Sequence, residues 1–175
     1  MAFQGTAEGT VDAKGRVCVP AKFREGFGQQ NQVMLWYSGN AQEPFLMLAA
    51  REEYNRVFRR EYKNAQPAQR AQVMRKIQVN SEPVDLDKSI RFGLPEKLAA
   101  KAGIRREDKI FFIGCHTYIE IWQLGNWNAQ EDGAHSDEDD APVRLDFAPD
   151  PEWLFDSVEG NAPAQADAEE EAFAP

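Results

Sequence analysis

The chain has 175 residues, a formal net charge of −9, and only two cysteines and two histidines. Two cysteines make no disulfide framework, no apolar segment is long enough to span a bilayer, and residues 1–4 lack the features of an export signal. These observations predict a reduced, cytoplasmic protein.

The negative charge is concentrated at the C-terminal end. Residues 128–175 hold 15 acids and one base, a net charge of −14, whereas the preceding residues hold 19 bases and 14 acids, a net charge of +5. At physiological salt, charges are screened over about 8 to 10 Å, so this small excess of positive charge does not force the protein to bind nucleic acid indiscriminately. The first 127 residues are therefore compatible with phosphate contacts, although the whole chain is acidic.

The first predicted elements follow a short polar turn. Residues 12–20 (DAKGRVCVP) place an acid and two bases before an apolar strand, and Pro20 predicts a short helix at residues 21–24. Apolar runs at residues 33–37 and 45–48, separated by a Gly-Asn turn, predict a hairpin.

Residues 50–79 predict two helices, with the break before Pro67. Apolar residues recur at helical spacing at Tyr54, Val57, Phe58, Tyr62, Val73, Met74 and Ile77. Basic residues occupy the other faces at Arg56, Arg59, Arg60, Lys63, Arg70, Arg75 and Lys76. Three roles are open for this basic surface: contact with DNA, pairing across a subunit boundary, or an ordinary solvated helix face.

The first series of elements is repeated about 75 residues later. Residues 87–95 (DKSIRFGLP) repeat the acid, bases and proline, residues 96–99 predict a short helix, and apolar runs at residues 110–113 and 118–122 predict a second hairpin. A copy of about 45 to 50 residues is near the lower size limit for an independent core. We therefore expect one mainly β, α+β domain whose two halves pack together or interdigitate their hairpins.

Residues 12–24, the second copy ending in RFGLP, and the closing segment IEIW at residues 119–122 together resemble the MraZ family. The resemblance covers about residues 1–128. It implies a double AbrB-like, swapped-hairpin pseudo-dimer of the double-ψ type, with halves at about residues 5–49 and 82–125 and a helical connector at residues 50–80. It also implies a bacterial transcription factor that forms closed rings and binds repeated sites upstream of the division and cell-wall gene cluster.

The resemblance implies that both polar turns meet DNA. Carried over by position, it nominates four DNA-binding residues: Lys14, Arg16, Lys88 and Arg91, of which Lys88 is the weaker candidate. Asp12 and Asp87 are predicted to be structural, because a short carboxylate at a turn accepts backbone N–H groups but repels phosphate. Gly15 is the third predicted turn residue.

One position separates the two turns. Ile90 stands where the family motif has the glycine that is Gly15 in the first copy. A β-branched residue does not readily adopt a positive φ, so we expect the second turn to differ in shape, and its contact with DNA is left open.

Cys115-His116, in the predicted turn of the second hairpin, is the main candidate for a nucleophile or a metal ligand. The remaining Cys18 and His135 lie in a strand and in the C-terminal region, so no zinc-ligand spacing can be assembled. We predict buried or turn-lining thiols, no catalytic residue, no metal and no cofactor.

Residues 129–175 are rich in Ala, Pro, Asp and Glu, which predicts a mostly disordered acidic tail. Its apolar cluster is Trp153, Leu154 and Phe155. Three roles are open for the tail: a docking peptide for a protein partner, a solubilising segment, or an autoinhibitory segment that competes with phosphate at the basic turns.

The preferred hypothesis is a non-enzymatic, sequence-specific DNA-binding transcriptional regulator, a repressor of its own gene cluster by resemblance. It would act in the cytoplasm at the nucleoid, as a ring-like homo-oligomer on repeated double-stranded sites, with affinity built from many weak contacts. The alternative hypothesis is an oligomeric interaction scaffold that recruits a protein partner through its acidic tail.

Overall fold

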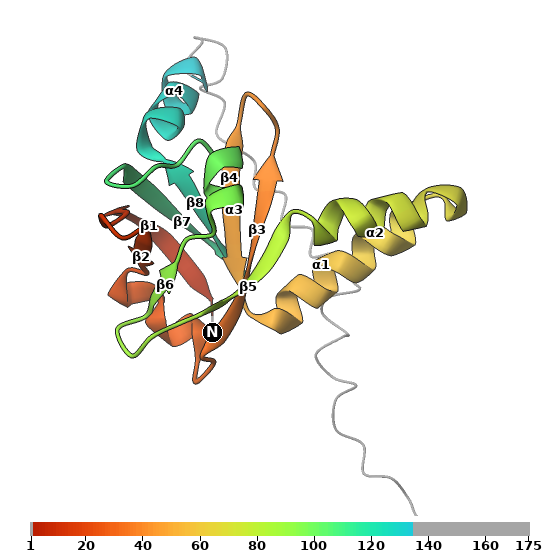
Figure 1. Ribbon diagram of the computed structural model, residues 1–175, viewed down its shortest axis with the longest axis horizontal. Helices are drawn as coiled ribbons and strands as arrows, with labels where there is room; N and C mark the ends of the chain where they lie inside the picture. The colour runs from red at the N-terminus through yellow and green to blue at the C-terminus, as the bar shows by residue number, and fades with distance from the viewer. Residues whose placement is uncertain (1, 135–175) are drawn as a thin grey trace, which may run out of the picture. The chain divides into compact units, whose positions relative to one another are not determined.

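A computed structural model describes residues 2–134 of the chain (Figure 1). The first half contains β1 (Phe3–Thr10), β2 (Arg16–Cys18), the 3-10 helix η1 (Ala21–Phe27), β3 (Gln32–Gly39) and β4 (Pro44–Ala49). The second half repeats this order with β5 (Ser81–Asp85), β6 (Arg91–Gly93), α3 (Glu96–Lys101), β7 (Lys109–His116) and β8 (Tyr118–Gln123). Both hairpins and both short helices lie where the sequence predicts them.

The two halves exchange strands. The larger sheet is antiparallel, with the strand order β1-β7-β8-β4-β3-β5, so the first strand of each half pairs with the hairpin of the other half. Phe3 is opposite His116 at one edge, and Gln32 is opposite Asp85 near the other. The two hairpins lie side by side, with β8 paired to β4, so the halves pack together and exchange only their first strands. The predicted α+β, mainly β fold is confirmed.

A second, two-stranded sheet joins β2 to β6, with Val17 opposite Phe92 at its centre. These two side chains are 0% and 2% exposed and belong to the main hydrophobic core. Burial of an apolar side chain of this size stabilises the fold by roughly 1.5 to 3 kcal/mol. Because side chains alternate along a strand, the neighbours Arg16 and Arg91 lie on the opposite, outer face of this small sheet.

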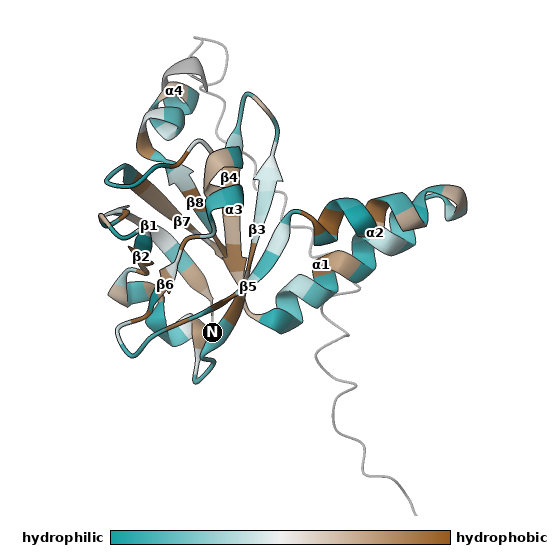
Figure 2. Cartoon of the chain, viewed as in Figure 1, coloured by the Kyte–Doolittle hydropathy of each residue, from teal (hydrophilic) through white to brown (hydrophobic). Residues whose placement is uncertain are grey.

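Apolar residues from both halves make up the main core. Phe23 and Leu98 of the two short helices occupy equivalent places in it, joined by Leu46 of β4 and Ile121 of β8, which lie opposite each other at the centre of the large sheet. Figure 2 shows hydrophobic residues gathered along β7, while hydrophobic and hydrophilic bands alternate along the connecting helices. Neither half holds this core alone, as expected for units of this size.

The connector consists of α1 (Arg51–Asn64), the short 3-10 helix η2 (Pro67–Gln69) and α2 (Arg70–Gln78), with the break where Pro67 predicts it. Figure 1 shows α1 and α2 side by side, extending away from the sheets. Tyr54 fixes the base of the pair, since its ring lies 5.5 Å from that of Trp36 and its hydroxyl is 2.7 Å from Ser81 Oγ.

The predicted apolar stripe of the connector is only partly covered. Tyr54 is the buried residue of α1, whereas Val57 and Phe58 are half-buried and Tyr62 is 36% exposed. The stripe is covered progressively less because the helices leave the sheet that would bury it. Within residues 2–134, no helix is long and apolar enough to cross a membrane.

The last described element is α4 (Leu124–Ala134). Sequence composition places the start of the acidic tail at residue 129, but residues 129–134 continue this helix. Trp127, in the first part of α4, stacks on Phe111 with ring centroids 5.3 Å apart, which attaches the helix to β7. The predicted docking cluster, Trp153, Leu154 and Phe155, lies outside the described residues.

Candidate nucleic-acid interface

The first turn, residues 12–16, is organised by one carboxylate. Oδ1 of Asp12 accepts the backbone N–H groups of Lys14 and Arg16 at 2.9 and 2.8 Å, and Oδ2 accepts Nε of Arg16 at 2.8 Å. The turn closes through the N–H of Gly15, which donates to the carbonyl of Asp12 at 2.9 Å. Gly15 has a φ of +75°, a left-handed conformation that glycine adopts without steric cost.

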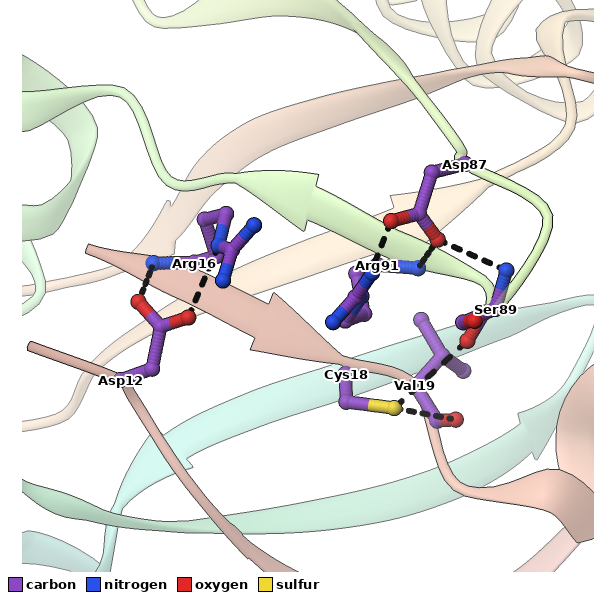
Figure 3. A network of polar contacts seen from close by, with 7 residues as sticks. All are labelled: Asp12, Arg16, Cys18, Val19, Asp87, Ser89 and Arg91. Carbon is purple, nitrogen blue, oxygen red and sulfur yellow. Dashed lines mark hydrogen bonds and ion pairs between the residues drawn. The ribbon is translucent and has the colours of Figure 1, made fainter. Parts of the chain in front are cut away.

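The second turn, residues 87–91, has the same hydrogen bonds (Figure 3). Asp87 accepts the N–H groups of Ser89 and Arg91 at 2.8 and 2.9 Å, and its Oδ2 accepts Nε of Arg91 at 2.9 Å. Ile90 has a φ of +51°, in the same left-handed region as Gly15. The expectation that isoleucine would give this turn a different shape is therefore wrong.

The strain at Ile90 is offset by contacts on several sides. Its N–H donates to the carbonyl of Asp87 at 2.8 Å, its carbonyl accepts the N–H of Val19 at 3.0 Å, and its side chain packs against the main core. A left-handed conformation costs an isoleucine roughly 1 to 2 kcal/mol, which one backbone hydrogen bond and partial burial of the side chain can together balance.

The turns also brace each other. The carbonyl of Ile90 accepts from Val19, just after β2, and the carbonyl of Gly15 accepts the N–H of Leu94, just after β6, at 2.9 Å. The fourth residue of each turn is thus tied to the strand of the other half. This pseudo-twofold arrangement holds the two arginine-bearing turns at a fixed spacing.

Hydrogen bonding lowers the pKa of both turn carboxyls. The backbone N–H of Arg16 is the leading cause at Asp12, assisted by the Arg16 side chain and the Lys14 N–H. At Asp87 the backbone N–H of Arg91 leads, followed by the N–H of Ser89 and the Arg91 side chain. Both aspartates are therefore ionised at neutral pH and hold their arginines as charge-assisted partners.

The structure brings the nominated arginines together on one surface. Figure 3 shows Arg16 and Arg91 on adjacent strands, each beside its own aspartate. The side chains of Arg16 and Arg91 are 40% and 41% exposed, and within residues 2–134 only Nε of each guanidinium has a protein partner. The Nη ends of both are therefore available to a phosphate or to the edge of a base. Lys14 and Lys88 lie in the same turns and are exposed.

Two neighbours of the turns were missed by sequence reasoning. Sγ of Cys18 lies 3.6 Å from the carbonyl oxygen of Ser89, against the second turn. Arg106 lies against the first turn, since a Cβ added at Gly15 would be 3.6 Å from its Nε. The consecutive arginines Arg105 and Arg106, which have no counterpart in the first copy, were the available signal in the sequence.

The basic residues of the connector are partly engaged within it. Arg56 donates to Glu53 through Nε at 2.8 Å, and the guanidinium of Arg70 lies 5.1 Å from the ring centre of Tyr62. Figure 1 shows these helices extending away from the sheets that carry the two turns. The connector and the turns are thus separate basic surfaces.

The Cys115-His116 pair lies at the end of β7. Burial raises the pKa of the Cys115 thiol to about 11, with the charge of Glu120 adding to the effect. A thiol with this pKa is protonated at neutral pH and is a poor nucleophile or metal ligand.

A family described as "MraZ protein, putative antitoxin-like" matches residues 2–75 and 79–146. Three relatives named "Transcriptional regulator MraZ" have similar coverage. The Geobacter metallireducens protein is 32% identical over 72% of this chain and 85% of its own length. The Burkholderia cenocepacia protein is 33% identical over 75% and 89%, and the Thermomicrobium roseum protein is 30% identical over 73% and 86%. The chain belongs to the MraZ family.

Proposed function

We propose that this chain is a sequence-specific DNA-binding transcriptional regulator, which represses its own division and cell-wall gene cluster by binding repeated upstream sites as a ring-like homo-oligomer. It would act in the cytoplasm, at the nucleoid. The observation that carries the proposal is the pair of aspartate-braced arginine turns on one outer face. The names of the relatives support the same class of function.

The braced turn suits recognition of a base edge. Because Asp12 fixes Nε of Arg16, the guanidinium approaches DNA with its two Nη nitrogens, the end that can donate two parallel hydrogen bonds to the O6 and N7 atoms of guanine. The brace also restricts a long side chain before binding, which reduces the entropy lost on contact. Lys14, which is exposed and lies in the same turn, would add a sequence-independent phosphate contact.

The modest charge of the core region predicts weak binding by each turn. With a net charge of only +5 over the first 127 residues, non-specific attraction is limited, and affinity would come from several subunits engaging several repeats. The binding free energy lost when one contact is removed from every subunit is then multiplied by the number of repeats that the oligomer engages.

Arg16→Ala tests this function by fluorescence anisotropy on duplexes from the region upstream of the chain's own gene, with one repeat or two. We expect about tenfold weaker binding to one repeat and about a hundredfold to two, since a good arginine–base contact contributes roughly 1 to 3 kcal/mol. Arg59→Ala on the connector removes the same charge and should change neither affinity by more than about twofold.

Two results would contradict the proposal. If wild-type protein bound the upstream DNA no better than scrambled duplex across a salt series, sequence-specific regulation would be excluded and the scaffold hypothesis favoured. Equal losses for Arg16→Ala on one and two repeats would instead exclude the multivalent mechanism.

A further inference from the structure

A hollow of about 660 Å³ lies beside the first turn. Lys14 and Gly15 line one side of it, and Arg105 and Arg106, between α3 and β7, line another. Its walls therefore come from both halves of the chain, and it borders the turn that carries Arg16.

Cations outnumber acids around this hollow. Lys14, Arg105 and Arg106 face two carboxylates, Glu96 and Asp108. Oδ2 of Asp108 already accepts the backbone N–H of Arg105 at 2.8 Å. The carboxylate of Glu96 would compete with a bound anion for Arg106, because its Oε1 lies 3.5 Å from Nη2 of Arg106. The two side chains of this pair are 92% and 63% exposed, so the pair is a weak surface contact that a phosphate can displace.

The second turn has no equivalent arginine pair. Each half has a loop that leads into its hairpin, and the backbone N–H just before each turn donates to that loop in the other half. Val11 donates to Asp108 at 3.0 Å, and Leu86 donates to Asn31 at 2.7 Å. The loop beside the second turn, residues 28–31, has the sequence Gly-Gln-Gln-Asn and contains no arginine, whereas the loop beside the first turn contains Arg105 and Arg106.

The fourth residue of each turn is consistent with the presence of arginines beside the first turn and their absence beside the second. Gly15 has no side chain, so Arg106 can lie against the backbone of the first turn. At the same position of the second turn, Ile90 places an apolar side chain against the main core. Only the first turn therefore combines its own lysine and arginine with two further guanidinium groups.

We propose that the hollow binds a phosphodiester group of the DNA backbone, held by Arg106 and Lys14, next to the base pairs that Arg16 reaches. This inference rests on the proposed DNA-binding function. It assigns the larger share of the affinity for DNA to the first turn. A phosphate contact carries no sequence information but fixes the register in which Arg16 meets the bases.

Arg106→Gln tests the assignment on a single-repeat duplex and on a scrambled duplex, each over a salt series. We expect binding to both duplexes to weaken by about three- to tenfold. The slope of log affinity against log salt concentration should become shallower by about 0.9, the value for one lost phosphate contact. Arg106→Lys should keep the wild-type slope, and Lys63→Gln, at the far end of α1, should leave slope and affinity within error.

Glu96→Gln provides a variant with the opposite effect. It removes the competing carboxylate from a fully solvated position and should tighten binding to both duplexes by about two- to threefold. Because Glu96 is 92% exposed, the fold does not depend on it, and this result stands even if Arg106→Gln is poorly folded.

Three results would overturn the inference. Unchanged affinity and slope for Arg106→Gln, with wild-type protein binding its site, would refute the phosphate contact and leave the proposed function intact. A loss confined to the repeat sequence would make Arg106 a base-reading residue instead. Calorimetric binding of pyrophosphate that Arg106→Gln abolishes, while DNA affinity stays unchanged, would assign the hollow to a free anion. Failure of wild-type protein to bind any DNA would refute the proposed function itself.

Discussion

The first and second turns have the same backbone design but different surroundings. In each, an aspartate accepts two backbone N–H groups and the Nε of an arginine, at distances that agree within about 0.1 Å. They differ at the fourth position, where Gly15 borders Arg106 and Ile90 packs on the core. The aspartate and the interlocked strands thus set the shape of the turn, while the fourth residue decides which side chains can approach it.

Exchange of the two fourth residues is the strongest test of this comparison. Gly15→Ile should lower the free energy of unfolding by about 1 to 2 kcal/mol, because it forces a β-branched residue into the left-handed region with no core pocket to receive it. Ile90→Gly should change it by less than about 1 kcal/mol, since relief of strain offsets the lost burial and the greater freedom of the unfolded chain. Urea unfolding of both variants measures the difference.

Gly15→Asn is the matched control for that exchange, because asparagine tolerates a positive φ. It should lower the free energy of unfolding by less than half as much as Gly15→Ile does. Equal destabilisation by Gly15→Ile and Ile90→Gly would contradict the predicted balance at Ile90, because it would show that the packing of this side chain outweighs the strain of its backbone.

The arginines provide a second comparison. On a single-repeat duplex, Arg91→Ala should weaken binding by about threefold, compared with about tenfold for Arg16→Ala, because the second turn lacks the neighbouring arginine pair. Each substitution leaves one aspartate without its arginine, so this cost is the same at both turns and cancels in the comparison. Equal losses of affinity for the two variants, measured by fluorescence anisotropy, would show that both turns contribute equally to DNA binding.

The third test concerns pH. The pKa of Asp12 and Asp87 in the folded protein lies below the ordinary value of 3.8. The two carboxylates therefore contribute stability that is present above that value and is lost as pH falls through their lowered pKa. Carbon-detected NMR titration should give midpoints below 3.8 for both residues.

Arg16→Ala sharpens this titration. It should raise the midpoint of Asp12 only part of the way to 3.8, since the leading cause is the backbone N–H at position 16, which alanine retains. The midpoint of Asp87 should not move. A complete return of Asp12 to 3.8 would show that the arginine side chain, and not the backbone, lowers its pKa.

The sequence predicted the parts of this protein that depend on local patterns. Apolar runs identified both hairpins, Pro67 identified the break in the connector, and the repeat identified the two halves. The shape of the second turn was mispredicted because φ preference is a local property, whereas Ile90 is held by Val19, 71 residues earlier in the chain. Arg106 was missed for a similar reason, since its closeness to Gly15 arises only when β1 pairs with β7.

The exchange of strands also constrains the order in which the nascent chain folds. β1 spans Phe3–Thr10, but its only sheet partner in residues 2–134, β7, does not begin until Lys109. At a synthesis rate of about 5 to 20 residues per second, the N-terminal segment waits roughly 5 to 20 s on the ribosome before that partner is made. The first half is therefore synthesised with β1 unpaired, and the larger sheet can be completed only after residues 109–116 have been made.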